Sequence, residues 1–167
     1  MSDDAARMYS QAMGRIHDAN ILAQALDRQS DSGAIIRILG FEVFLKCAVL
    51  LSIGEIPKLG HNYFCLWKKL PAEASNEIML VALTHMPESS DLSQMKTLLD
   101  AYEFVFKKAR YYYELYEGCT NEQVRETGER WIANGAKNEE AEVVYYQKEL
   151  MCLIEGLSSF IAGRLEA

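Results

Sequence analysis

Apolar side chains recur along much of this chain in steps of three and four residues, the spacing that places them on one face of an α-helix. The pattern predicts a first helix over about 2–26, a long helix over about 91–116 and a last helix over about 138–165. The β-branched residues never alternate with polar ones in the manner of a strand bounded by turns. The chain is therefore expected to be all-α.

The segment 34–53 is the most apolar part of the chain, and it predicts a helix that is apolar around nearly its whole circumference. Only a few charged residues interrupt it, and two of them, Glu42 and Lys46, are spaced as an i,i+4 pair. A helix of this kind is expected either at the centre of a bundle or at an interface. A hinge containing Gly and Pro follows, after which His61 or Asn62 begins a short helix.

Cap and turn residues divide the remainder of the chain into further helices. A helix over about 71–83 follows the hinge region. Asp91 with Gln94, and Thr120 with Gln123, have the spacing of a capping box, a signature of helix starts. Together these elements predict an antiparallel up-and-down bundle of four to five long helices with short connecting helices.

Composition narrows the class of protein. The chain has 167 residues, 50% of them hydrophobic and 25% charged, which is enough for one sizeable core, so a single domain over 1–167 is expected. The opening MSDDAARMYSQ lacks the charged-then-apolar pattern of a secretory signal, and charged residues interrupt the most apolar segment. We therefore expect a cytoplasmic protein with no membrane span.

The cysteines and the short motifs argue against several kinds of enzyme. The 4 cysteines fall singly, without a C-x-x-C pair or a His at ligand spacing, so they are expected to be free thiols and no metal site is expected. The sequence has no P-loop, G-x-G-x-x-G, G-x-S-x-G or H-E-x-x-H motif. Nucleotide hydrolysis, dehydrogenase chemistry and zinc proteolysis have no residues to support them, and no cofactor is expected.

Charge is unevenly distributed along the chain. The formal net charge is −7, which argues against nonspecific binding of nucleic acid. The segment 37–69, however, has five basic against two acidic residues, and the segment 96–113 has four against two. A locally basic face could approach phosphate, although ordinary solvated lysines explain the same counts.

Two segments of the chain resemble a known family. They are the segment 41–63, which contains FEVFLK, AVLL, GE and KLGHNY, and the segment 106–114, which contains FKKARY and YE. The first resembles the second helix and the following His-containing turn of HEPN domains, and the second resembles the Arg-Tyr end of that family's later long helix. The resemblance covers about 5–117, so 118–167 is expected to be a C-terminal helical extension.

The resemblance implies a helical bundle, frequent homodimerisation, and one of three roles: an RNA-cleaving toxin, a partner of a minimal nucleotidyltransferase, or a noncatalytic binding module. Active ribonucleases of the family carry an Arg followed four to six residues later by a His. Here no His follows Arg110, because His17, His61 and His85 all precede it. The usual cleavage mechanism therefore lacks an imidazole to move protons.

A displaced site is the alternative for catalysis. His61 would act as base, Glu42 would orient it, and Arg110 and Lys46 would stabilise a phosphorane. We favour a structural interpretation, in which Glu42 pairs with Lys46 or with Arg110 and His61 hydrogen-bonds the hinge. Tyr111 could stack on a base. The candidate binding or displaced-site residues are Glu42, Lys46, His61, Asn62, Arg110 and Tyr111.

These observations favour a noncatalytic HEPN-like binding or interaction protein, a homodimer that acts in a toxin–antitoxin or defence system. Its partner would be another protein, an RNA or a nucleotide. Two alternatives stay open: a metal-independent endoribonuclease with a displaced His61/Arg110 site, and a module that binds a small ligand or nucleotide.

Overall fold

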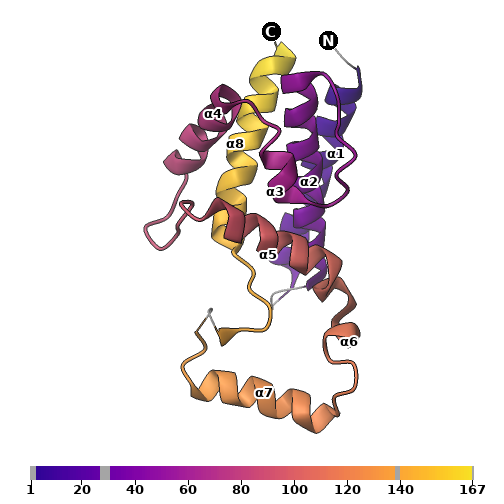
Figure 1. Cartoon of the computed structure of the whole chain (residues 1–167), viewed down its shortest axis with the longest axis vertical. Helices are drawn as coiled ribbons and strands as arrows, with labels where there is room; N and C mark the ends of the chain where they lie inside the picture. Colours follow the sequence, from indigo (N-terminus) through magenta and orange to yellow (C-terminus); the bar gives the residue numbers. More distant parts are fainter. Residues whose placement is uncertain (1–2, 27–30, 138–139, 167) are drawn as a thin grey trace.

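A computed structural model of the chain describes residues 3–26, 31–137 and 140–166, and the regular structure within them is entirely helical (Figure 1). The expected all-α class is therefore confirmed. The helices are α1 (Asp3–Ala25), α2 (Asp31–Ile53), α3 (Tyr63–Trp67), α4 (Ala72–Thr84), α5 (Met95–Lys107), the 3₁₀ turn η1 (Ala109–Tyr111), α6 (Tyr112–Leu115), α7 (Asn121–Ala133) and α8 (Gln147–Glu166).

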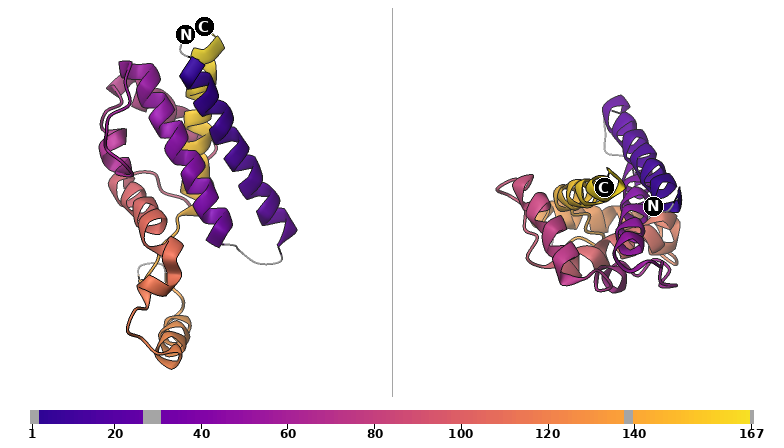
Figure 2. Two further views of the ribbon diagram at one scale, coloured as in Figure 1. Left: turned by 90° about the vertical axis from the view of Figure 1, so that its right-hand side faces the viewer. Right: turned by 90° about the horizontal axis from the view of Figure 1, so that it is seen from above.

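The main body is built from long helices packed side by side. Helix α2 packs against α1 on one side and against α8 on the other, and α4 covers a further side of α8. Helix α1 runs opposite to α2, whereas α8 runs in the same direction as α2, so both ends of the chain lie at one end of the body (Figures 1 and 2). Helix α5 crosses near the opposite end and contacts both α2 and α3.

Helix α2 lies at the centre of the core, which explains why it is apolar nearly all round. Its buried side chains include Phe41, Phe44 and Leu45, and α1, α3, α5 and α8 all contact it. Residues 118–167 contribute α8 to the same core, with Leu153 and Leu157 fully buried. Helices of the same chain thus bury the central part of α2.

Two glycines allow the central helices to approach closely. A Cβ at Gly40 of α2 would lie 2.7 Å from Cδ1 of Ile16 on α1. A Cβ at Gly156 of α8 would overlap the backbone carbonyl oxygen of Ile78 on α4. Because real Cβ contacts are never this short and the second obstacle is backbone, Gly156 fixes the separation of α4 and α8.

Three expected helix boundaries are wrong. The long helix expected over 91–116 begins at Met95 and ends at Lys107, and Asp91 accepts hydrogen bonds from Ser93 instead of capping it. The last helix begins at Gln147, not near Asn138, so 140–146 precede it. Apolar spacing continues past Lys107, but a helix is stable mainly where its apolar face packs, and the described side chains of α6 are exposed or half-buried. The first helix was expected to begin at Ser2, which lies outside the described residues, as does residue 138 itself.

The expected start of α7 is confirmed. Thr120 accepts a hydrogen bond from the Gln123 backbone N–H, and the Gln123 side chain accepts one from the Thr120 N–H, which completes a capping box. Helix α7 has no buried residue and lies beyond the main body (Figure 1). No helix in the part of the chain that the structure describes is long and apolar enough to cross a membrane.

Candidate functional site

The hinge after α2 turns the chain back so that His61 meets α2. Gly60 adopts a left-handed conformation with φ +58°, which few residues other than glycine tolerate. Asn62 then caps α3, since its Oδ1 accepts the Cys65 backbone N–H at 2.8 Å. The expected role of Asn62 at the helix start is confirmed, and its side chain is committed to that cap.

Glu42 is the centre of a buried polar cluster. Its exposed fraction is only 4%. Oε1 accepts a hydrogen bond from Lys46 Nζ at 2.6 Å, and Oε2 accepts from Tyr63 OH at 2.9 Å and from His61 Nδ1 at 2.8 Å. Burial raises the pKa of Glu42, but the bonds from Lys46, His61 and Tyr63 outweigh it, so its pKa is lowered below 4.5. The carboxylate stays ionised and fully hydrogen-bonded.

The imidazole of His61 is held but not enclosed. Nδ1 is taken by Glu42, and 40% of the side chain is exposed, so Nε2 is the nitrogen left for a ligand. The ring also lies against Phe106 of α5, with 4.7 Å between the ring centroids. The hinge and α5 together position His61 at the surface above a buried carboxylate.

Arg110 contacts the same Phe106 ring, because α5 ends at Lys107 and the chain turns into η1. The guanidinium carbon is 5.0 Å from the centroid of the Phe106 ring and 4.7 Å from that of Tyr111. Phe106 therefore contacts both His61 and Arg110. The Tyr111 ring in turn lies 6.2 Å from that of Tyr113, and both tyrosines are exposed.

The sequence-based candidates are thus brought together in part. Glu42, Lys46 and His61 interact directly, as the displaced-site alternative required. The expected ion pair between Glu42 and Arg110 is not formed among the described residues, because Glu42 is occupied by nearer donors and Arg110 rests on aromatic rings. Within the same residues no group of His, Cys, Asp and Glu could hold a metal ion.

The free thiols agree with expectation. Cys47, Cys65, Cys119 and Cys152 form no disulfide with one another. Cys47 and Cys152 are buried, and burial raises the pKa of Cys47 to about 11, so it stays protonated at neutral pH. A buried, protonated thiol is a packing residue and not a nucleophile.

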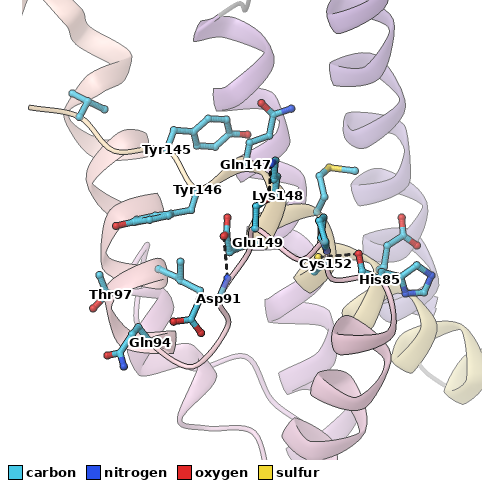
Figure 3. Close-up of a pocket in the computed structure, with 16 residues that line it drawn as sticks. His85, Asp91, Gln94, Thr97, Tyr145, Tyr146, Gln147, Lys148, Glu149 and Cys152 are labelled. Atoms are coloured by element: carbon cyan, nitrogen blue, oxygen red, sulfur yellow. Dashed lines mark hydrogen bonds between the residues drawn. The ribbon is translucent and has the colours of Figure 1, made fainter. Parts of the chain in front are cut away.

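A cleft of about 1010 Å³ was missed by the sequence analysis (Figure 3). It lies between the α4–α5 loop, the start of α5 and the segment that leads into α8. Figure 3 shows Glu149 between Tyr146 and Asp91. Glu149 is 9% exposed, and its Oε1 accepts the Asp91 backbone N–H at 3.3 Å.

Hydrogen bonds hold the segments around the cleft in place. Tyr102 OH donates to the Tyr146 carbonyl at 2.9 Å, and Lys148 Nζ donates to Ser89 Oγ at 2.7 Å. Three segments that are far apart in the sequence form the cleft, so no local sequence motif predicts it. One signal was present, because Glu149 is spaced with Leu153 on the buried face of α8, where a carboxylate is unusual.

Comparisons of the chain with protein family models, with curated proteins and with solved structures gave no match. The HEPN-like resemblance of 5–117 therefore stays a prediction that rests on its residues.

Proposed function

We propose that this protein is a noncatalytic HEPN-like binding module that holds single-stranded RNA at the Phe106 surface, formed by His61, Phe106, Arg110 and Tyr111. One observation carries the proposal. His61 and Arg110 both contact the ring of Phe106: the His61 and Phe106 ring centroids are 4.7 Å apart, and the Arg110 guanidinium carbon is 5.0 Å from the Phe106 centroid. Both side chains are accessible, so a guanidinium that donates hydrogen bonds to phosphate and an imidazole are held by one aromatic side chain.

The chemistry of this surface suits a nucleotide strand. A guanidinium that rests on a ring keeps its N–H groups in its own plane for a phosphate. Tyr111 and Tyr113 are exposed beside it, and Tyr113 is 73% exposed, so both rings are available to stack on bases. Lys108, between Phe106 and Arg110 in the sequence, is also exposed. Phosphate contacts combined with stacked aromatic rings are the usual means of binding single strands without sequence readout.

Two features argue against cleavage. Glu42 shares its charge with Lys46 and also accepts a hydrogen bond from Tyr63, so it is not reserved for activating His61. Attack by a ribose hydroxyl also needs both a base and an acid. His17 lies on α1 and His85 at the end of α4, and neither belongs to the Phe106 surface.

The displaced-site endoribonuclease is the second candidate, and one distance favours it. The 2.8 Å bond between Glu42 Oε2 and His61 Nδ1 orients the imidazole and leaves Nε2 as a base, and Arg110 contacts the same Phe106 ring as His61. This arrangement requires no metal ion. It differs from the binding module in one respect, which is whether RNA held at the surface is cut.

Binding and cleavage should be measured on the same samples. We expect fluorescence anisotropy to show that the pure protein binds a labelled mixed-sequence single strand, and that Tyr111→Ala weakens binding roughly tenfold, because stacking one base is worth about 1–3 kcal/mol. Arg110→Ala should weaken binding and reduce its dependence on salt. Arg7→Ala is the matched control, since Arg7 is an exposed arginine near the far end of the body.

The outcomes separate the candidates. Intact RNA on a gel, with binding that depends on Arg110 and Tyr111, supports the binding module. Cleavage that is lost in a folded His61→Gln variant replaces it with the endoribonuclease. Binding unaffected by Arg110→Ala and Tyr111→Ala, or reduced equally by Arg7→Ala, contradicts the Phe106 surface as the binding site.

Homodimerisation belongs to the same proposal. Its support is an apolar patch on the outer face of α4, where Leu80 is 68% exposed and Leu83 is also exposed one turn further on. Light scattering at micromolar concentration should then give about twice the 18.9 kDa mass of the chain. A role in a toxin–antitoxin or defence system rests on the HEPN resemblance alone.

A further inference from the structure

The cleft of Figure 3 contains a buried charge that lacks a counter-ion. Glu149 is 9% exposed, and among the described residues no Lys, Arg or His lies within 4.0 Å of its carboxylate. Its hydrogen bond from the Asp91 N–H is 3.3 Å long, whereas charge-assisted bonds are typically about 2.7–2.9 Å. Lys148 is adjacent in sequence but donates to Ser89 instead. Buried carboxylates are normally paired, so Glu149 is an exception that needs an explanation.

Negative charges outnumber positive ones around the cleft. Asp91 and Glu155 line it together with Glu149, and Lys148 is the one basic residue among Lys and Arg in the lining. Hydrogen bonds from the backbone and side chain of Ser93 lower the pKa of Asp91, so this carboxylate is ionised at neutral pH. The cleft therefore attracts cations.

The shape and lining of the cleft identify the kind of cation. The acids are not grouped closely enough to hold a metal ion within the described part of the chain. Tyr145 and Tyr146 line the cleft, and tyrosine rings attract ammonium groups through their faces. A volume of about 1010 Å³ also greatly exceeds that of a single hydrated ion. Separated carboxylates and aromatic rings suit an extended organic cation with several separated charges.

We propose that this cleft binds a small aliphatic polyamine, with one ammonium group paired to Glu149 and another near Asp91 or Glu155. The ammonium group at Glu149 supplies the counter-ion that the described residues do not. The methylene chain lies against Tyr145, Tyr146 and Val143. This site is distinct from the Phe106 surface, and it stands whether or not that surface binds RNA.

Isothermal titration calorimetry with spermidine at low salt tests the proposal. We expect saturable binding, with Glu149→Gln raising Kd at least about tenfold, because a charge-assisted hydrogen bond and an ion pair are lost. Glu73→Gln is the matched control. It removes the same charge from an exposed position at the opposite end of α4 from the cleft, and should leave Kd unchanged.

Thermal unfolding provides a second measurement that does not depend on affinity alone. Glu149→Gln removes an uncompensated buried charge, so without spermidine the variant should be at least as stable as the natural protein. Spermidine should raise Tm of the natural protein and of Glu73→Gln, but raise it much less in Glu149→Gln. An equal concentration of MgCl₂ should not reproduce the shift.

Several results would overturn the assignment. No binding at about 10 mM spermidine would show that the cleft takes another ligand or none. Equal Kd values for Glu149→Gln and the natural protein would show that the polyamine binds elsewhere. If Glu73→Gln loses as much affinity as Glu149→Gln, the loss follows from the net charge of the protein and not from the cleft. An equal shift with MgCl₂ would show nonspecific counter-ion binding. A marked drop in Tm for Glu149→Gln would mean that the charge is already stabilised within the fold.

Discussion

Glu42 and Glu149 are both buried glutamates, yet their surroundings differ. Glu42 accepts bonds from Lys46, His61 and Tyr63, all within 3 Å, whereas Glu149 has one bond of 3.3 Å from a backbone amide. A charge that is fully compensated within the chain stabilises the fold. A charge that is not compensated within the chain can still form a favourable ion pair with a bound cation. Burial alone therefore does not distinguish the two glutamates, whereas the number and length of the hydrogen bonds that each accepts do.

The largest expected effect distinguishes the two glutamates directly. Glu42→Gln should lower the free energy of unfolding by about 3 kcal/mol, at the lower end of the cost of breaking a buried ion pair, because Lys46 is partly exposed. Glu149→Gln should cost close to nothing. Urea denaturation measures both, and equal losses would remove the distinction between the two sites.

The next effect concerns the donors to Glu42. Tyr63→Phe should cost about 1.5–3 kcal/mol, since hydrogen bonds to a charged group are worth this much. Tyr102→Phe is the matched control, because its hydroxyl donates to the uncharged Tyr146 carbonyl and should cost only about 0.5–1.5 kcal/mol. If Tyr102→Phe proves the more damaging of the two in urea, the Glu42 cluster is weaker than its geometry indicates.

The pH dependence should be smaller, and part of it should come from Glu42. Its pKa is lowered from 4.5 in the folded protein, so its contribution is fully present above pH 4.5 and is lost as the pH falls through the folded pKa. Urea midpoints measured from pH 6 down to pH 3 should therefore fall less steeply for Glu42→Gln than for the natural protein. Parallel curves would argue that Glu42 is not preferentially ionised by folding.

The smallest expected effect is at Arg110. Because Arg110 is exposed and does not pair with Glu42, Arg110→Ala should lower stability only through its lost contacts with Phe106 and Tyr111, by about 0.5–1 kcal/mol. Its effect should add to that of Glu42→Gln within about 0.5 kcal/mol in a double-mutant cycle. A larger coupling energy would restore the ion pair that the sequence suggested.

Features that depend on residues close in the sequence were predicted well, whereas contacts between distant segments were predicted poorly. The i,i+4 spacing of Glu42 and Lys46 and the capping box at Thr120 depend on neighbouring residues, and both occur as expected. The partner of Glu42 across the bundle was predicted incorrectly, because periodicity does not show that α5 stops at Lys107. Once that helix ends, Arg110 is carried onto Phe106 and away from the carboxylate.

The cleft also could not be predicted from apolar spacing. The residues 143–146 were assigned to the last helix because their spacing continues its apolar seam. They instead form an extended approach to α8 and one wall of the cleft, a role decided by contacts with α5 such as the Tyr102–Tyr146 bond. Apolar spacing records which side of a segment is buried, but not whether the segment is helical.

The contact between Gly156 and Ile78 has an evolutionary consequence. Position 156 is closed to every side chain while α4 keeps its place, so any descendant of this sequence that gains a Cβ there must also move α4. The cleft lies at the end of that helix, beside His85. A mutation at Gly156, which does not line the cleft, would then change the shape of the cleft by moving the end of α4.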